Sequence, residues 1–272
     1  MPVVKKQTQL KKPAGKARGI AGRIKPVELH GGVKLLVYGK GKTGKTRFAS
    51  TFPKKVLIAG TEDGTRSVVN VKGVDFVLLK SSQDMEDVID LARDGGYSTL
   101  CLDHAGGLQD LILKEILGLE DMPVQKSWGI AKQQDWGTSS MQTKERLRHL
   151  LDLADTHETN VVIIAHERNF NDNEESDLIF PTVGAALTPS VAGWLNGAVE
   201  YICQTFIREE TKEVSMVKGK TTQKKTGKVE YCLRIGPHPV YMTGFRVPMG
   251  VEIPDSVSDP SYEKIRKLIE GK

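Results

Sequence analysis

The chain has 272 residues, of which 27% are charged and 39% hydrophobic, and its formal net charge is +5 at pH 7. This length suits one well-buried α/β domain with a tail. No stretch approaches the ~20 consecutive apolar residues of a membrane span, and the basic N-terminus lacks the apolar core of a secretory signal, so we expect a cytoplasmic protein with no membrane partner. Three widely spaced cysteines, Cys101, Cys203 and Cys232, predict buried thiols and no disulfide framework.

The first 28 residues carry most of the positive charge. Eight lysines and arginines stand there against the single acid Glu28, which gives this segment +7 and leaves −2 for the rest of the chain. Because the segment also contains Pro and Gly and shows no helical periodicity, we predict a disordered basic tail over residues 1–28. Such a tail either holds a polyanion electrostatically or only keeps the protein in solution.

A glycine-rich motif directly follows the apolar run at residues 33–38. It reads G-K-G-K-T-G-K-T, and a short helical stretch over residues 45–50 comes next. A strand, a glycine-rich turn and a helix aim backbone N–H groups and the positive helix end at one point, which binds phosphate. Lys45 is expected to reach the β- and γ-phosphates, and the Thr46 hydroxyl to bind Mg²⁺. The predicted ATP-binding residues are Gly39, Lys40, Gly41, Lys42, Thr43, Gly44, Lys45 and Thr46, with ATP and Mg²⁺ as cofactors.

Short apolar runs alternate with amphipathic stretches from Val33 to Ala165. This alternation predicts an α/β fold of repeated βα units, with a mainly parallel central sheet flanked by helices. The expected strands cover residues 34–38, 56–59, 75–79, 99–103 and 161–165, and the expected helices cover residues 81–94, 108–117 and 138–156.

Three of these strands end in side chains that suit ATP hydrolysis. Asp103 suits a carboxylate that orients the metal ion, with a helix-capping aspartate as the alternative. Glu62 or Asp63 could polarise the attacking water if their strand neighbours the P-loop strand, or could form a polar turn. His166 stands where a side chain can sense the γ-phosphate, or it is a solvated strand-end histidine. The other histidines show no spacing for a zinc site.

The character of the chain changes after Asn169. Residues 169–177 are too polar to pack and predict an exposed, mobile loop. Two antiparallel strands are expected near residues 199–207 and 229–235, joined by a basic hairpin tip over residues 218–228. We place the domain boundaries at residues 1–28 for the tail, 29–253 for the ATPase core and 254–272 for a C-terminal loop and short helix.

Residues 30–250 resemble the RecA-like ATPase core, in particular phage-type ATP-binding proteins that anneal single strands in recombination. The residues that carry the resemblance are the P-loop, Glu62, Asp103 and the strand end at His166. It implies a RecA-like P-loop NTPase fold with antiparallel strands added near the C-terminus. It also implies that Glu62 activates water, that Asp103 and Thr46 hold the metal ion, and that His166 takes the place of the sensor glutamine of RecA itself.

RecA-like proteins carry two DNA-binding loops, which by position correspond to residues 119–138 and 168–190. Aromatic and basic side chains in such loops stack on bases and hold phosphates. Four acidic residues between 172 and 177 oppose DNA contact by the second loop. The two tryptophans of the first loop suit the core or a subunit contact equally well. The candidate residues are Lys126, Trp128, Lys132 and Trp136 in the first loop and Arg168, Asn169 and Phe170 in the second.

The resemblance further implies self-assembly into a ring or filament, in which a basic residue of one subunit reaches the γ-phosphate of the next. Arg246 is the candidate, although the lysine that usually accompanies it in this phage group is missing here. Lys218 and Lys220 are alternatives.

The predicted function is therefore that of a RecA-like ATPase that binds and hydrolyses Mg-ATP, binds single-stranded DNA and promotes annealing and recombination. Its expected partners are single-stranded DNA, further copies of the chain and a single-strand DNA-binding protein, in the host cytoplasm if a phage encodes it. Two alternatives stay open: a P-loop motor ATPase or small-molecule kinase, and a DNA scaffold that holds nucleotide without turning it over.

Overall fold

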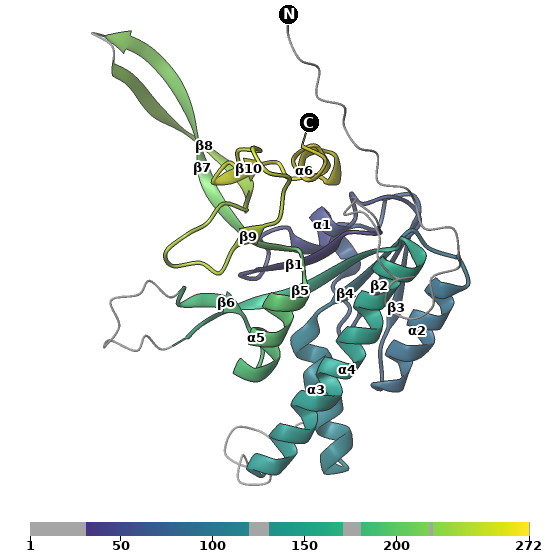
Figure 1. Ribbon diagram of the computed structural model, residues 1–272. Coiled ribbons are helices and arrows are strands. Elements are labelled where there is room, and N and C mark those ends of the chain that lie inside the picture. The colour runs from purple at the N-terminus through teal and green to yellow at the C-terminus, as the bar shows by residue number, and fades with distance from the viewer. Residues whose placement is uncertain (1–30, 120–130, 171–180, 218–219, 272) are drawn as a thin grey trace, which may run out of the picture.

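One sheet forms the centre of the computed structural model, which describes residues 31–119, 131–170, 181–217 and 220–271 (Figure 1). Its strand order is β10-β8-β7-β1-β5-β4-β2-β3, and every neighbouring pair from β7 to β3 is parallel. The central strands are continuous buried apolar runs because both faces of the sheet are covered. The parallel strands are β1 (Lys34–Gly39), β2 (Val56–Gly60), β3 (Val74–Leu78), β4 (Thr99–Asp103), β5 (Asn160–Asn169) and β7 (Tyr201–Val217).

Each face of the sheet has its own hydrophobic core. Leu36 and Tyr38 of β1 pack with one group of helices, whereas Leu35 and Val37 pack with another, because successive side chains of a strand point to opposite faces. No helix within the described ranges is long and apolar enough to cross a membrane. The first face carries α2 (Gln83–Arg93), α3 (Ala105–Leu117), α4 (Gln133–His157) and α5 (Pro189–Ala198), and the second carries α1 (Lys45–Ala49) and α6 (Tyr262–Ile269).

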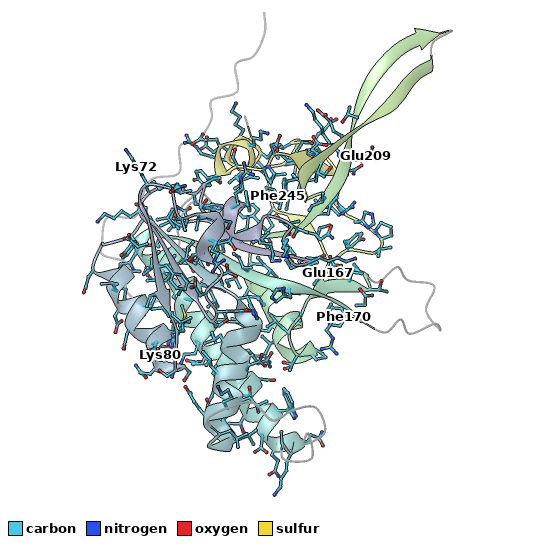
Figure 2. All side chains as sticks on the ribbon, turned by 180° about the vertical axis from the view of Figure 1, so that it is seen from behind. Lys72, Lys80, Glu167, Phe170, Glu209 and Phe245 are labelled. Atoms are coloured by element: carbon cyan, nitrogen blue, oxygen red, sulfur yellow. The ribbon has the colours of Figure 1, made fainter. Side chains whose placement is uncertain are left out.

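Antiparallel strands extend the sheet near the C-terminus. The long β7–β8 hairpin projects from the body (Figure 1), and Glu209 lies at its base (Figure 2). With this addition, the predicted α/β fold with a mainly parallel sheet, flanking helices and late antiparallel strands is confirmed. The added strands are β6 (Val183–Ala185), β8 (Lys220–Arg234), β9 (Gly244–Phe245) and β10 (Ser256–Ser258), which pair with β5, β7, β7 and β8 respectively.

The hairpin is longer than the sequence pattern predicts. Residues 220–228, predicted as part of a basic hairpin tip, belong to β8, which pairs with β7 as far as Val217 and Lys220. Apolar runs do not predict this extension, because an antiparallel ladder needs only backbone hydrogen bonds and the threonines of this segment favour extended structure.

Two helices begin earlier than predicted. The carboxylate of Asp135 accepts a hydrogen bond from the backbone N–H of Lys132 at 2.8 Å, and this cap starts α4 at Gln133 and not at residue 138. The His104 side chain caps α3 in a similar way and starts it at Ala105. Because Gly106 and Gly107 are poor helix formers, the sequence pattern does not predict this first turn of α3.

The predicted DNA-binding loops overlap regular structure as a result. Trp136 lies in α4 and Lys132 caps it, whereas Lys126 and Trp128 lie outside the described residues. Strand β5 continues to Asn169 because it pairs there with β6, and the Arg168 guanidinium lies 5.6 Å from the centre of the Phe170 ring. The tail over residues 1–28 and the acidic part of the second loop also lie outside the described residues.

The strand order shows that one condition of the prediction for Glu62 is not met. Strand β2, which carries Glu62 at its end, does not neighbour the P-loop strand β1, because β5 and β4 lie between them. Glu62 must therefore reach the site across the ends of two strands.

Candidate functional site

Four parallel strands bring the predicted site residues to one edge of the sheet. Gly39 of β1 pairs with His166 of β5, while Asp103 of β4 pairs with Ile164 of β5 and with Gly60 of β2. The carboxyl ends of these strands are thus level with one another. Ligands of open α/β sheets bind at such an edge.

The P-loop is a tight turn held against strand β7. Lys42 and Gly44 have positive φ angles of 64° and 90°. The hydroxyl oxygens of Thr43 and Thr205 lie 2.6 Å apart and share a hydrogen bond. A Cβ atom on Gly39 would lie 2.3 Å from the Thr205 Oγ1, so only glycine allows this close approach.

Lys45 lies inside the turn and is buried. Its Nζ donates hydrogen bonds to the carbonyl oxygens of Gly39 at 2.9 Å and Lys40 at 2.8 Å. Burial lowers the pKa of the Lys45 ammonium group, while the nearby carboxylates of Asp103 and Glu167 raise it. The loop therefore gathers one ammonium group and several backbone N–H groups, which is the chemistry that binds phosphate oxygens.

Thr46 and Asp103 stand next to each other. The Thr46 hydroxyl donates a hydrogen bond of 2.7 Å to the Asp103 Oδ2. A hydroxyl and a carboxylate are the hard oxygen ligands that Mg²⁺ prefers beside substrate phosphates, so this pair fits the predicted metal ion. The alternative prediction for Asp103, a helix cap, is wrong because the capping side chain of α3 is His104.

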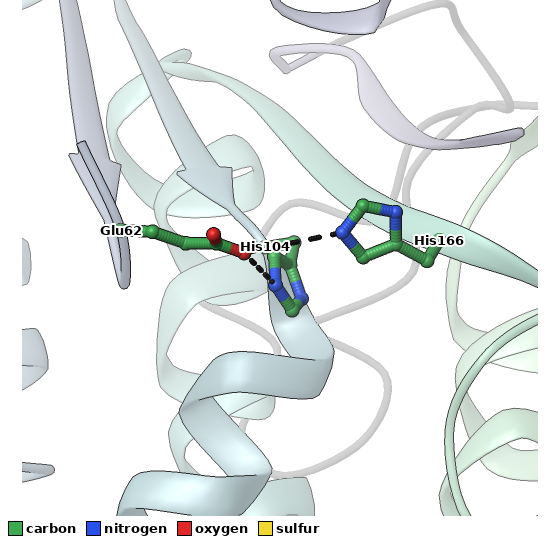
Figure 3. A group of neighbouring side chains, drawn as sticks. All are labelled: Glu62, His104 and His166. Atoms are coloured by element: carbon green, nitrogen blue, oxygen red, sulfur yellow. Dashed lines mark hydrogen bonds and ion pairs between the residues drawn. The ribbon is translucent and has the colours of Figure 1, made fainter. Parts of the chain in front are cut away.

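Glu62, His104 and His166 form a cluster at the same edge (Figure 3). The His104 Nε2 lies 2.8 Å from the Glu62 Oε1, and the His166 Nε2 lies 4.0 Å from that oxygen. The two imidazole rings pack edge to face with their centroids 4.5 Å apart. The Glu62 side chain is 68% exposed, so its carboxylate is open to water.

Hydrogen bonding decides which nitrogen of His104 carries the proton. The backbone N–H of Gly107 donates to the Nδ1 at 3.0 Å, so the lone pair is on Nδ1 and the proton is on Nε2. The Nε2–H therefore donates to the Glu62 carboxylate. Because a metal ion would need the lone pair of Nε2, we interpret this cluster as a hydrogen-bonded carboxylate and not as a metal centre.

The environment of His166 favours its neutral form. Burial lowers the pKa of His166, and electrostatic interactions with His104 and Lys45 lower it further, while Glu62 and Asp103 raise it. The pairing of His166 with Gly39 places the histidine close to the P-loop. A neutral imidazole at this position can accept or donate a hydrogen bond near pH 7.

A family model described as an AAA domain matches residues 31–247. The match begins just before β1 and includes every residue of the site described above. This chain belongs to that AAA domain family. AAA domains are in general ATPases, so the chain carries a nucleotide-binding domain with a P-loop NTPase fold. No curated protein matches the chain.

The AAA domain contains two polar residues that sequence reasoning missed. His104 shows no spacing for a zinc site in the sequence, yet it contacts Glu62 in the fold. Arg66, on a short 3₁₀ helix (Thr65–Ser67), lines a cavity of about 600 Å³ together with Lys45 and Thr46 of the P-loop. Two signals were available in the sequence: His104 directly follows Asp103, and Arg66 stands four residues after Glu62. Neither signal indicates a contact unless the fold is known.

Arg246 lies near the opposite end of the parallel strands from the P-loop. Its neighbour Phe245 pairs with Tyr201 at the start of β7, whereas Thr205 of the same strand pairs with Gly39 of the P-loop. The Arg246 guanidinium donates to the carbonyl oxygen of Gly197 at 3.4 Å. A role for Arg246 in the site of a neighbouring subunit stays a prediction, and Lys218 and the Lys220 side chain lie outside the described part of the chain.

Proposed function

We propose that this AAA domain hydrolyses Mg-ATP and that Glu62 is the base for the attacking water. The observation that supports this most directly is the Glu62 carboxylate, exposed to water yet held by the His104 Nε2–H at 2.8 Å. General bases act through hydrogen bonds to the proton they remove, so an oriented and accessible carboxylate suits the role.

The other residues of the site have complementary roles in this proposal. Lys45 and the backbone of the P-loop bind the β- and γ-phosphates, and Thr46 and Asp103 would hold Mg²⁺, which would neutralise charge on the phosphate oxygens. Glu62 orients a water molecule and takes its proton as the oxygen bonds to the γ-phosphorus. The bond between the γ-phosphorus and the bridging oxygen breaks, and ADP leaves. His166 senses whether the γ-phosphate is present.

His104 is a positioning residue that acts through Glu62. Replacing His104 with alanine is expected to lower kcat by about ten- to hundredfold while KM changes little, because a hydrogen bond to a charged group contributes about 1.5–3 kcal/mol. Steady-state ATPase kinetics measure both constants. His104→Gln keeps an N–H donor and should recover part of the rate, while His157→Ala, at an exposed histidine, serves as the control. An unchanged kcat in His104→Ala would contradict the role.

We further propose that nucleotide state controls binding of single-stranded DNA by this chain. Two features of the sequence support a nucleic-acid partner: the +7 charge of residues 1–28, and the combination of lysine and tryptophan near residues 126–136. Strand annealing is the activity that the resemblance to phage recombination proteins favours.

The DNA proposal predicts that single-stranded DNA raises the ATPase rate several-fold. A phosphate-release assay with and without an oligonucleotide measures this. Duplex DNA of the same length and an oligonucleotide at high salt are the controls, because electrostatic binding weakens with added salt. An ATPase rate that does not change when DNA is added would instead favour the P-loop motor or small-molecule kinase alternative.

A further inference from the structure

A pocket of about 250 Å³ lies at the amino ends of the parallel strands, at the opposite end from the P-loop. Its walls come from the residues before β1, the starts of β5 and β7, and helix α6 on the second face of the sheet. Because one water molecule takes about 30 Å³ of the liquid, this volume suits a small organic molecule or one long side chain. The polar groups that line the pocket belong to Asn160, Glu200, Tyr201, Tyr262, Arg266 and Glu270.

Tyr201 opens a free hydroxyl group into this pocket. Only 5% of the residue is exposed, and its ring packs against Phe245 with the ring centroids 4.6 Å apart. The Tyr201 hydroxyl forms no hydrogen bond with the described residues, although every fully enclosed polar side-chain atom among them has a partner. The hydroxyl is therefore not enclosed by protein and faces the pocket that Tyr201 lines. Since a buried hydroxyl without a partner costs free energy, a ligand that bonds to it gains affinity.

Glu200 adds a half-buried carboxylate that forms no ion pair with the residues that the structure describes. The two cations near it have other partners. The Lys34 Nζ lies 2.6 Å from the Asp155 Oδ2, and the Arg246 guanidinium donates to a backbone carbonyl oxygen at 3.4 Å. Burial raises the pKa of Glu200, and Asp155 also raises it, while the charges of Lys34 and Arg246 lower it only in part. A carboxylate in this position is stabilised by a cation that enters the pocket.

The main hydrogen-bond donors in the pocket wall are already engaged. The Arg266 Nε donates to the Glu270 Oε1 at 2.7 Å. The Val33 backbone N–H donates to the Asn160 Oδ1 at 3.1 Å. The groups that remain are a carboxylate, a hydroxyl oxygen and aromatic rings, all of which attract a positively charged donor. The pocket therefore favours a cation over a phosphate or carboxylate ligand.

We propose that this pocket binds an organic cation, an alkylammonium or guanidinium group. Glu200 is its counter-ion, the Tyr201 hydroxyl oxygen accepts a hydrogen bond from it, and the Tyr262 ring adds a cation–π attraction. The site is separate from the P-loop, because the two lie at opposite ends of the parallel strands. Binding of the cation is therefore measured without ATP and does not depend on the proposed hydrolysis.

Two sources can supply the cationic group. One is a free diamine. The other is the basic segment of this chain, residues 1–28, which ends just before Gly31 in the pocket wall. The last arginine and lysine of that segment are Arg23 and Lys25. A variant in which both are replaced by glutamine distinguishes the two sources, because it removes only the internal one.

Calorimetric titration of the full chain with 1,4-diaminobutane at low salt tests the site. The diamine should bind, whereas 1,4-butanediol, which has the same length and no charge, should not. Glu200→Gln and Tyr201→Phe should each lose about tenfold or more in affinity for the diamine, as expected for one charge-assisted hydrogen bond. Asp63→Asn, at an exposed carboxylate at the other end of the strands, is the control and should bind like the wild type.

The Arg23→Gln, Lys25→Gln double variant identifies the source. Equal affinity of this variant and the wild type for the diamine would support a free cation as the ligand. About tenfold tighter binding by the double variant would show that the chain's own basic segment competes for the pocket.

Three results would overturn the cation site. The first is that neither the wild type nor the double variant binds the diamine. The second is that the diol binds as tightly as the diamine. The third is that Glu200→Gln and Tyr201→Phe keep full affinity. Thermal unfolding of each variant checks that it is folded, and if one of the two pocket variants fails to fold, the other gives the same comparison.

Discussion

Replacing Glu62 with glutamine is expected to slow ATP turnover by about 10²–10⁴-fold, the usual contribution of a general base. Glutamine keeps the size of the side chain and can still accept a hydrogen bond from the His104 Nε2–H, but it cannot take a proton from water. Affinity for Mg-ATP should stay within a few-fold of the wild type. A phosphate-release assay at saturating ATP measures the rate, and titration with the non-hydrolysable β,γ-imido analogue of ATP measures binding.

Asp63 provides a matched control for this prediction. It is the neighbouring exposed carboxylate, and it accepts a hydrogen bond of 3.0 Å from the Thr65 hydroxyl instead of joining the cluster at the sheet edge. Asp63→Asn should retain most of the wild-type rate. If Asp63→Asn were the slower variant, the base would have to be assigned to Asp63.

Replacing Lys45 with alanine is the second change with a large expected effect. The buried ammonium group is the only side-chain cation that the described P-loop turn encloses, with bonds to the Gly39 and Lys40 carbonyl oxygens. Its loss should reduce turnover by about 10²–10³-fold or more, as removal of one preorganised electrostatic contact typically does, and should also weaken binding of both ATP and tripolyphosphate.

The control for Lys45→Ala is Lys42→Ala. Lys42 lies in the same turn but its side chain is exposed, so its removal should change phosphate affinity only slightly. Because Lys45 also satisfies two carbonyl oxygens, thermal unfolding of both variants should accompany the assay. Full affinity for tripolyphosphate in a folded Lys45→Ala protein would contradict the proposed phosphate site.

Much of the parallel half of the fold follows from local sequence patterns. Strands β1, β2 and β4 are short apolar runs bounded by charged or glycine-rich segments, and the P-loop has a fixed spacing of glycine, lysine and threonine. These signals are local, so they predict the elements, and the rule that ligands bind at the carboxyl ends of parallel strands assigns Thr46 and Asp103 to one metal ion.

What sequence could not predict depends on contacts between distant segments. The order of strands places β4 and β5 between β1 and β2, which no local pattern states. The contact of His104 with Glu62 exists only because β2 and β4 are neighbours. The long β7–β8 hairpin likewise depends on backbone pairing of polar residues.

The most direct test of the central claim compares ATP hydrolysis and ATP binding in three purified proteins: wild type, Lys45→Ala and Glu62→Gln. We expect that the wild type hydrolyses Mg-ATP, that Lys45→Ala binds it more weakly and turns it over about 10²–10³-fold more slowly or worse, and that Glu62→Gln binds it normally with turnover slowed by about 10²–10⁴-fold. Equal turnover in the wild type and Glu62→Gln would contradict the assignment of the base. Tight binding without any turnover in the wild type would show a nucleotide-holding scaffold and contradict the proposal that this AAA domain is an active ATPase.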